Sequence, residues 1–128
     1  MAEYTTTIEV RFADMDAYGH VNSAHYFTYL EAARLKVFHS LFHELSASEM
    51  LLVVGRAECD YRIPILPTVA TVGVTLQIAT LGKTSFNLEY RIHDLQGTTY
   101  ATAKTLMVCF DSRTQRPVSV PEQIRKMA

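Results

Sequence analysis

The feature that most constrains the fold is a run of 23 residues, from Ser23 to Leu45, that contains neither proline nor glycine. Its apolar residues recur at helical spacing, as in Tyr26, Leu30, Ala33, Val37 and Leu41. Further apolar residues on neighbouring sides make the run too hydrophobic for a helix that lies on the surface. At 1.5 Å per residue, we expect one long buried helix of roughly 30 Å, which is the width of a small domain.

The segments around this run alternate between apolar and polar residues, which is the period of a half-buried strand. Strands are expected at about 4–12, 53–63, 72–78, 86–92 and 98–110. In the second of these, Val53, Ala57 and Cys59 should share one face. Short connections such as "LGKTS" join the later strands, and a short helix is possible after Pro121. This order predicts an α+β fold, with an antiparallel five-stranded sheet wrapped around one helix.

The composition is that of one ordinary globular domain, so we expect a single domain over residues 1–128. Hydrophobic residues make up 48% and charged residues 20%, with a net charge of -1. Nucleic-acid binding is not expected, because it requires many cations to neutralise phosphates. The second half is nonetheless basic, with eight Lys or Arg against four Asp or Glu from residue 61 onward. A local cluster there would suit one small polyphosphate.

Other features of the sequence bear on the state of its cysteines, its location in the cell and metal binding. Cys59 and Cys109 lie in apolar or alternating runs and are interpreted as free thiols. The N-terminus lacks a targeting pattern and no apolar window is long enough for a membrane span, so a soluble cytoplasmic protein is expected. His39 and His43 have a spacing that suits a metal, but no carboxylate follows in a zinc-hydrolase pattern. We therefore expect neither a metal nor a cofactor.

Polar residues crowd the loop before the predicted helix, in the stretch "DMDAYGHVN" from Asp14 to Asn22. Asn22 or Ser23 is placed to cap the helix, but capping does not explain Asp16, Gly19 or His20. The start of a helix carries unpaired N–H groups and a partial positive charge, which would polarise a carbonyl oxygen. Attack on an acyl group needs at least two groups: donors that stabilise the oxyanion, and a carboxylate that acts as nucleophile or base.

"DMDAYGHVN" followed by "YFTYLEAAR" resembles the signature of hotdog-fold acyl-CoA thioesterases of the 4-hydroxybenzoyl-CoA thioesterase type, particularly the long-chain members. The resemblance implies the hotdog fold and hydrolysis of acyl-CoA to free acid and CoA. It implies that Asp16 is the catalytic carboxylate, either as nucleophile or through a water. The backbone amide of Ser23 would polarise the thioester carbonyl, with His20 and Asn22 as positioning residues.

The same resemblance implies where the substrate binds. Gly19 would let the loop approach the substrate, and the acyl group would lie near Tyr26. The CoA nucleotide would meet the hairpin "GKTS", where Lys83 brings a positive charge. The full set of expected substrate-binding residues is Gly19, Val21, Tyr26, Arg62, Gly82, Lys83, Thr84 and Ser85. Because the family builds its active sites where subunits meet, a homo-oligomer is implied, either a dimer or a dimer of dimers.

Several alternatives remain open from the sequence. Asp16 could serve only an Asx-turn, Asp14 is expected to be structural, and Glu31 is the second candidate for the carboxylate. An enoyl-CoA hydratase of the same fold is disfavoured, because such enzymes place Asn between Asp and His, whereas Asn22 follows His20. A non-catalytic acyl-CoA binding module is the third hypothesis. The acyl chain, and CoA as opposed to an acyl carrier protein, are not determined.

Overall fold

The computed structural model describes residues 2–128, and the helices and strands follow one another in the expected order. The elements are β1 (Glu3–Glu9), the 3-10 helix η1 (Phe12–Asp14), α1 (Ser23–Val37), α2 (His39–Ala47), β2 (Met50–Tyr61), β3 (Thr71–Leu81), β4 (Ser85–His93), β5 (Thr99–Asp111), β6 (Arg116–Pro117) and α3 (Glu122–Arg125). The short helix expected after Pro121 is α3.

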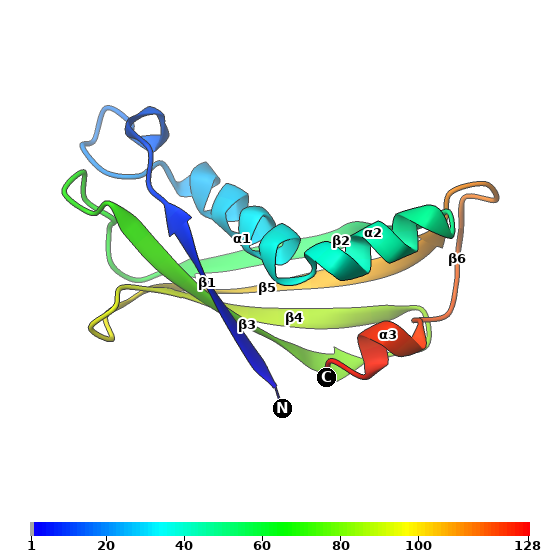
Figure 1. Cartoon of the computed structure of the whole chain (residues 1–128). Helices are drawn as coiled ribbons and strands as arrows, with labels where there is room; N and C mark the ends of the chain where they lie inside the picture. The colour runs from blue at the N-terminus through cyan, green and yellow to red at the C-terminus, as the bar shows by residue number, and fades with distance from the viewer. Residues whose placement is uncertain (1) are drawn as a thin grey trace.

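The strands form one antiparallel sheet in the order β1-β3-β4-β5-β2, with the two-residue β6 added to β5. Figure 1 shows α1 and α2 lying one after the other across the same side of this sheet. The expected α+β hotdog fold is therefore confirmed. The strand β6 is the one strand that the alternation did not predict.

The core lies between the sheet and one face of α1. Leu30 and Ala33 of the helix are fully buried, as are Val74 and Leu76 of β3 and Leu88 of β4. Full burial of one such aliphatic side chain stabilises the fold by about 1.5–3 kcal/mol. The helix start is thereby held against the sheet, together with the polar loop that precedes it.

The predicted long helix is interrupted at Phe38, and this part of the prediction is wrong. Phe38 leaves helical geometry, with φ −104° and ψ 20°, although no proline or glycine is present. Its ring is 4% exposed and packs against Tyr4 and Phe42. We attribute the break to this packing, because the bend lets two shorter helices follow the curved sheet better than one straight helix would.

The first strand ends earlier than the alternation predicts. β1 stops at Glu9, and Phe12 is 93% exposed at the start of η1. The backbone N–H and the guanidinium of Arg11 both donate to the Asp14 carboxylate. These bonds fold the chain into a turn, so Phe12 leaves the buried face that it would occupy in a continued strand.

A β-bulge at Gly55 corrects the predicted faces of β2. The pairing with β5 shifts register between Val54 and Arg56, so Val53 pairs with Val108 on the outer face of the sheet. Ala57 and Cys59 pair with residues of the inner face. Val53 therefore does not share their face, because one extra residue in a strand reverses the direction of every side chain before it.

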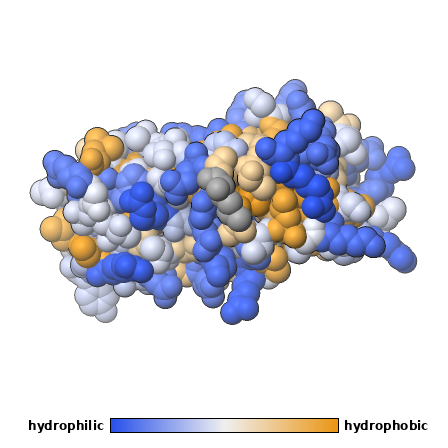
Figure 2. Space-filling view, turned by 90° about the horizontal axis from the view of Figure 1, so that it is seen from below, coloured by the Kyte–Doolittle hydropathy of each residue, from blue (hydrophilic) through white to orange (hydrophobic). Residues whose placement is uncertain are grey.

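Exposed apolar side chains gather along β2, one of the two edge strands of the main sheet. Leu51, Val53, Val54 and Tyr61 are each between 41% and 47% exposed. By contrast, hydrophilic residues cover most of the face seen from below in Figure 2, with a smaller hydrophobic patch near its middle. Both cysteines are free, Cys109 buried and Cys59 half-buried. No helix within residues 2–128 has the length and hydrophobicity to cross a membrane.

Candidate active site

The loop before α1 folds into a turn that is closed by contacts within its own backbone. Met15 and Val21 form an isolated antiparallel bridge, and the Asp16 N–H donates to the His20 carbonyl. Gly19 closes the turn with φ +84°, a conformation that favours glycine. A Cβ atom there would meet nothing within 4 Å. The glycine is therefore explained by backbone conformation and not by crowding.

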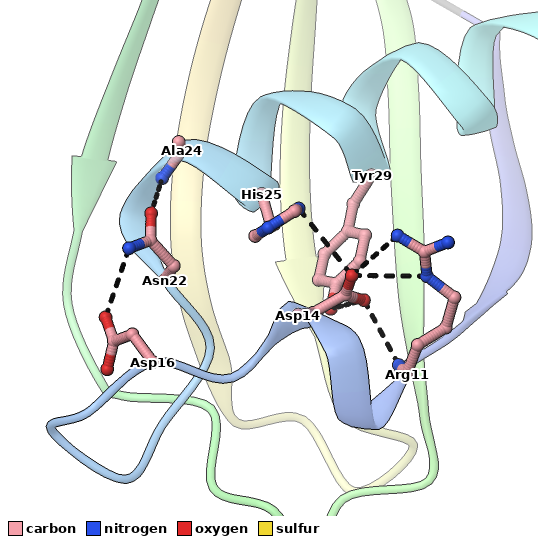
Figure 3. A network of polar contacts seen from close by, with 7 residues as sticks. All are labelled: Arg11, Asp14, Asp16, Asn22, Ala24, His25 and Tyr29. Carbon is pink, nitrogen blue, oxygen red and sulfur yellow. Dashed lines mark hydrogen bonds and ion pairs between the residues drawn. The ribbon is translucent and has the colours of Figure 1, made fainter.

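Asn22 joins the loop to the helix start (Figure 3). Its side-chain oxygen accepts from the Ala24 N–H at 2.9 Å, so Asn22 is the N-cap. Its side-chain NH2 donates to Asp16 Oδ2 at 3.3 Å. The N–H of Ser23, the first helical residue, has no acceptor among residues 2–128. One side chain thus links a carboxylate to a helix start that retains a free donor.

Asp16 divides its two oxygens between two neighbours. Oδ1 accepts from the Tyr18 N–H at 2.9 Å, which is the Asx-turn considered from the sequence. Oδ2 receives only the longer bond from Asn22. The side chain is half-buried, so the second oxygen remains available to a water or a substrate atom. The turn therefore orients the Asp16 carboxylate and leaves Oδ2 able to accept a further hydrogen bond.

Asp14 has the structural role expected of it. It is fully buried and receives hydrogen bonds from Arg11 and from the Tyr29 hydroxyl at 2.7 Å (Figure 3). Burial by itself would raise the pKa of this carboxyl, but the bonds from Arg11 and Tyr29 outweigh burial and hold the pKa below its usual range. His25 Nδ1 lies 3.6 Å away, too far for a hydrogen bond.

A cavity of about 280 Å³ opens beside the helix start, and we call it the loop cavity. Its lining residues are His20, Val21, Ser23, Tyr26, Tyr61, Arg62, Ile63 and Pro64. Four of the expected site residues besides Ser23 therefore meet here: His20, Val21, Tyr26 and Arg62. Asp16 is not part of the lining, and it is connected to the rim through Asn22.

Tyr61 is a residue of this cavity that sequence reasoning missed. Its hydroxyl donates to the Ser23 carbonyl at 2.7 Å, and its ring meets the Tyr26 ring edge-on at 4.7 Å between centroids. Burial raises the pKa of the Tyr61 phenol, so the hydroxyl stays protonated and able to donate. No local signal marks this residue, because it is one more apolar position of an alternating strand.

His20 lines the loop cavity, and one of its ring nitrogens faces a backbone carbonyl. Its Nδ1 is 3.2 Å from the Val21 carbonyl, which can only accept, so this contact favours the tautomer with the proton on Nδ1. The ring stacks on Tyr18 with an interplanar angle of 18°. This arrangement fits the positioning role expected for His20.

The hairpin Gly82–Ser85 lies far from this cavity in the same chain. It connects the far ends of β3 and β4, and its backbone binds the C-terminal part of the chain: Gly82 accepts from Arg125, and Lys83 from the Val120 N–H. β3 separates the two sites by roughly 30 Å, at about 3.3 Å per residue. One chain therefore does not bring the hairpin and Asp16 together.

A second cavity of about 410 Å³ lies where α1 and α2 meet the start of β2, and we call it the bend cavity. Apolar side chains form most of its lining: Leu35, Phe42, Leu45, Met50, Leu51, Leu52, Val54 and Met107. Glu31 and Arg34 supply its charged groups. Glu31, the second candidate for the carboxylate, is thus away from the Asp16 loop. Among residues 2–128, no group of His, Cys, Asp and Glu could hold a metal.

Comparisons with known proteins agree with this architecture. Residues 10–127 match the family model of the thioesterase-like superfamily. A protein of Pseudomonas aeruginosa described as a putative thioesterase, PA2801, superposes with a TM-score of 0.87 at 38% identity, covering 95% of both chains. The chain therefore belongs to the thioesterase-like superfamily of hotdog proteins, as its loop and helix motif suggested, and this membership supports thioester hydrolysis.

Two curated relatives carry more specific names. The long-chain acyl-CoA thioesterase FadM of Escherichia coli is 30% identical over 124 residues, covering 94% of this chain and 93% of that protein. The 1,4-dihydroxy-2-naphthoyl-CoA hydrolase of Synechococcus elongatus is 30% identical over 131 residues, covering 98% and 94%. One relative is named for a long-chain acyl group and the other for an aromatic one.

Proposed function

We propose that this chain hydrolyses acyl-CoA thioesters, with Asp16 as the catalytic carboxylate. The observation that carries the proposal is the connection from Asp16 through Asn22 to a helix start whose Ser23 N–H is free, at the edge of the loop cavity. The superfamily membership and the names of the two relatives support the thioester substrate.

The proposed chemistry uses two groups of the site. The thioester carbonyl oxygen accepts a hydrogen bond from the Ser23 N–H, which stabilises the negative charge that develops on that oxygen. Asp16 either attacks the carbonyl carbon itself or removes a proton from the water that attacks. The carbon–sulfur bond then breaks, and the CoA sulfur leaves as the thiolate and takes up a proton. If Asp16 attacked, water next hydrolyses the acyl–Asp16 anhydride; in both cases the free acid is released and the Asp16 carboxylate is restored. His20 and Asn22 hold the loop and the carboxylate in place.

A homodimer formed through β2 is part of this proposal. The two edges of the sheet differ: β1 presents Glu3, Thr5, Thr7 and Glu9, and the Lys36 ammonium donates to the Thr7 carbonyl. β2 is longer, at 12 residues, and its exposed side chains are largely apolar at the Met50 end and at Tyr61. A long edge strand with exposed apolar side chains is a template for pairing with another chain, although β2 also exposes Arg56, Glu58 and Asp60 in its second half. We therefore propose β2 as the interface.

Two-fold symmetry would bring the separated site residues together. Two copies of one strand paired about such an axis run antiparallel, so the Met50 end of β2 lies beside the Tyr61 end of its partner. The loop cavity is at the Tyr61 end and the bend cavity at the Met50 end. The loop cavity of one protomer would then adjoin the bend cavity of the other. Asp16 would act on an acyl group held between both subunits.

The same symmetry would supply cations for the CoA phosphates. Ser85 pairs with Val108, near the Met50 end of β2, so the Lys83 hairpin of the partner would lie at the Asp16 end of this chain. Arg62 would approach from the loop cavity of this chain. Lys83 would act through charge and not in the chemical step.

The direct test is Asp16→Asn with acyl-CoA substrates of several chain lengths and an aromatic one. Asn keeps the size of the side chain and its turn bond, but it loses the negative charge. We expect kcat to fall by about 10²–10⁴ with little change in KM. The matched control is Asp94→Asn, because Asp94 also accepts backbone N–H bonds in an exposed turn. A thiol reagent follows release of CoA.

The other outcomes distinguish the alternatives. Near-normal hydrolysis by Asp16→Asn would reduce Asp16 to a turn residue, and Glu31→Gln would be tested next. If the parent protein hydrates an enoyl-CoA but hydrolyses no thioester, the hydratase hypothesis is correct. If it only binds acyl-CoA in equilibrium titration, it is a binding module.

A further inference from the structure

A buried guanidinium in the bend cavity has no counter-charge. Arg34 is 8% exposed, on the face of α1 that meets the sheet. Its one hydrogen bond within residues 2–128 runs from Nη1 to the Tyr90 hydroxyl at 3.2 Å, and it forms no ion pair there. A guanidinium has five N–H donors, so most of its donor capacity is unused.

The protein holds this guanidinium through neutral groups. The Tyr90 hydroxyl lies 2.6 Å from the Thr105 hydroxyl, which in turn donates to the Met107 sulfur. Both Tyr90 and Thr105 are buried. Their side chains come from β4 and β5, beneath the helix. This chain of contacts fixes the position of Arg34 but leaves its charge uncompensated.

The surroundings of this cation are mainly apolar. The lining of the bend cavity is mainly aliphatic and aromatic, and Glu31, one turn earlier on α1, is exposed and forms no ion pair with Arg34. The Arg34 nitrogens without a hydrogen bond are not among the fully buried unpaired atoms of residues 2–128, so their N–H groups face the cavity. A largely buried charge is normally paired or hydrogen-bonded to an acceptor. An oxygen acceptor entering this cavity would meet donors that no residue of the chain satisfies.

We propose that the bend cavity binds the distal end of the acyl group, and that Arg34 selects acyl groups that carry an oxygen acceptor there, a carboxylate best. The inference rests on the proposed acyl-CoA hydrolysis and on the composite site. Arg34 is eleven residues, about 16 Å, along the helix from Ser23 of its own chain, so it serves the active site of the partner subunit. Arg34 is a specificity-determining residue and takes no part in the chemical step.

The acceptor preference follows from the balance of desolvation. A methyl-terminated chain gains contacts with the apolar walls. It would, however, displace water from the Arg34 donors and offer them no acceptor in its place. A distal carboxylate gains the same wall contacts and forms charge-assisted hydrogen bonds with the guanidinium. A distal hydroxyl is a neutral acceptor for one bond from the guanidinium, weaker than a carboxylate, and ranks between the two.

The test compares acyl-CoA substrates of equal chain length that end in a carboxylate, a hydroxyl or a methyl group. For the wild-type homo-oligomer we expect kcat/KM to fall in that order, with a ratio of about 10–100 between the first and last, as for one charged hydrogen bond. Arg34→Met keeps the apolar stem of the side chain and removes the guanidinium, so it should bring the ratio close to one, mainly by lowering kcat/KM for the carboxylate-terminated substrate. Tyr90→Phe, which frees the guanidinium from its anchor, should reduce the ratio partially.

The outcomes separate this inference from the proposed function. If no substrate of the panel is hydrolysed, the proposed function fails. If the methyl-terminated substrate is hydrolysed as well as the carboxylate-terminated one by the wild type, only the Arg34 inference is overturned, whether or not the variants fold. If Arg34→Met leaves the preference unchanged but weakens self-association in sedimentation, Arg34 pairs with a carboxylate of the partner subunit instead, and the inference is wrong.

Discussion

Two aspartates two residues apart occupy opposite environments in the loop before α1. Asp14 is fully buried under Arg11 and Tyr29, whereas Asp16 is half-buried and keeps one oxygen lightly bonded. The first is fixed by its partners and unavailable to a substrate. The second is oriented by a turn and remains accessible, as a nucleophile or base requires.

The role of Asp14 predicts a pH-dependent loss of stability. Asp14→Asn should lower the free energy of unfolding by about 1–3 kcal/mol at pH 7, because Arg11 and Tyr29 lose a charged acceptor. Because the folded pKa lies below the ordinary value of 3.8, the wild type holds this stabilisation above that pH and loses it as the pH falls further. Urea unfolding at pH 7 and near pH 3 should show the difference between the two proteins shrinking.

Glu3→Gln is the control for that measurement, since Glu3 is an exposed carboxylate on β1, away from the proposed interface. It should change the free energy of unfolding little at either pH. An Asp14→Asn protein as stable as the wild type at pH 7 would contradict the structural role of Asp14.

At the scale of elements, α1 has two faces of different character. One face is buried in the sheet, but Phe27 and Leu35 on another face are 37% and 52% exposed. These two residues fall in line with Ser23 and Glu31 at intervals of four, and three of the four line the loop or bend cavity. The expected burial of this helix is therefore only half achieved within one chain. Our proposal is that a second copy covers the rest.

Phe27→Asp tests the covered face of α1. A carboxylate placed in the proposed interface would be desolvated without a partner, so we expect dissociation to monomers at micromolar concentration. Hydrolysis should be lost with the partner, because the proposed site needs both subunits. Analytical ultracentrifugation and the thiol assay measure the two effects on the same samples.

The matched control is Leu95→Asp, which changes an 82% exposed side chain in the β4–β5 turn. It should leave both association and activity intact. A Phe27→Asp protein that remains a fully active dimer would rule out this helix face as the contact.

At the scale of the whole molecule, the Asp16 loop and the Lys83 hairpin lie at opposite ends of the sheet. In our proposal, a second copy that runs antiparallel to the first brings its own Lys83 hairpin beside Asp16, so that one CoA substrate contacts both. The basic surplus of the second half of the sequence contributes Lys83, Arg116 and Arg125 to the hairpin end.

Lys83→Ala tests this arrangement. We expect KM for acyl-CoA to rise by about fivefold at low salt and by less at high salt, because an exposed charge is screened by ions, while kcat stays nearly constant. The control is Lys104→Ala, which removes an exposed lysine from the middle of β5. A large fall in kcat would instead place the hairpin in the chemical step.

The sequence by itself determined the elements and the motif of the candidate site. Alternation predicted the five main strands, and the loop composition predicted a helix cap at Asn22 or Ser23, of which the structure uses Asn22, and a structural role for Asp14. These features depend on residues close in the chain, whose spacing and hydrogen-bonding groups act locally.

Only the tertiary structure decided what depends on contacts between distant residues. Packing of Phe38 against Tyr4 broke the helix, and the bulge at Gly55 moved Val53 to the other face. The curved sheet placed Gly82–Ser85 far from Asp16 and set Arg34 on Tyr90, which is 56 residues away. A linear pattern records which residues are apolar, charged or conformationally free, but it does not record which of them meet across a folded sheet.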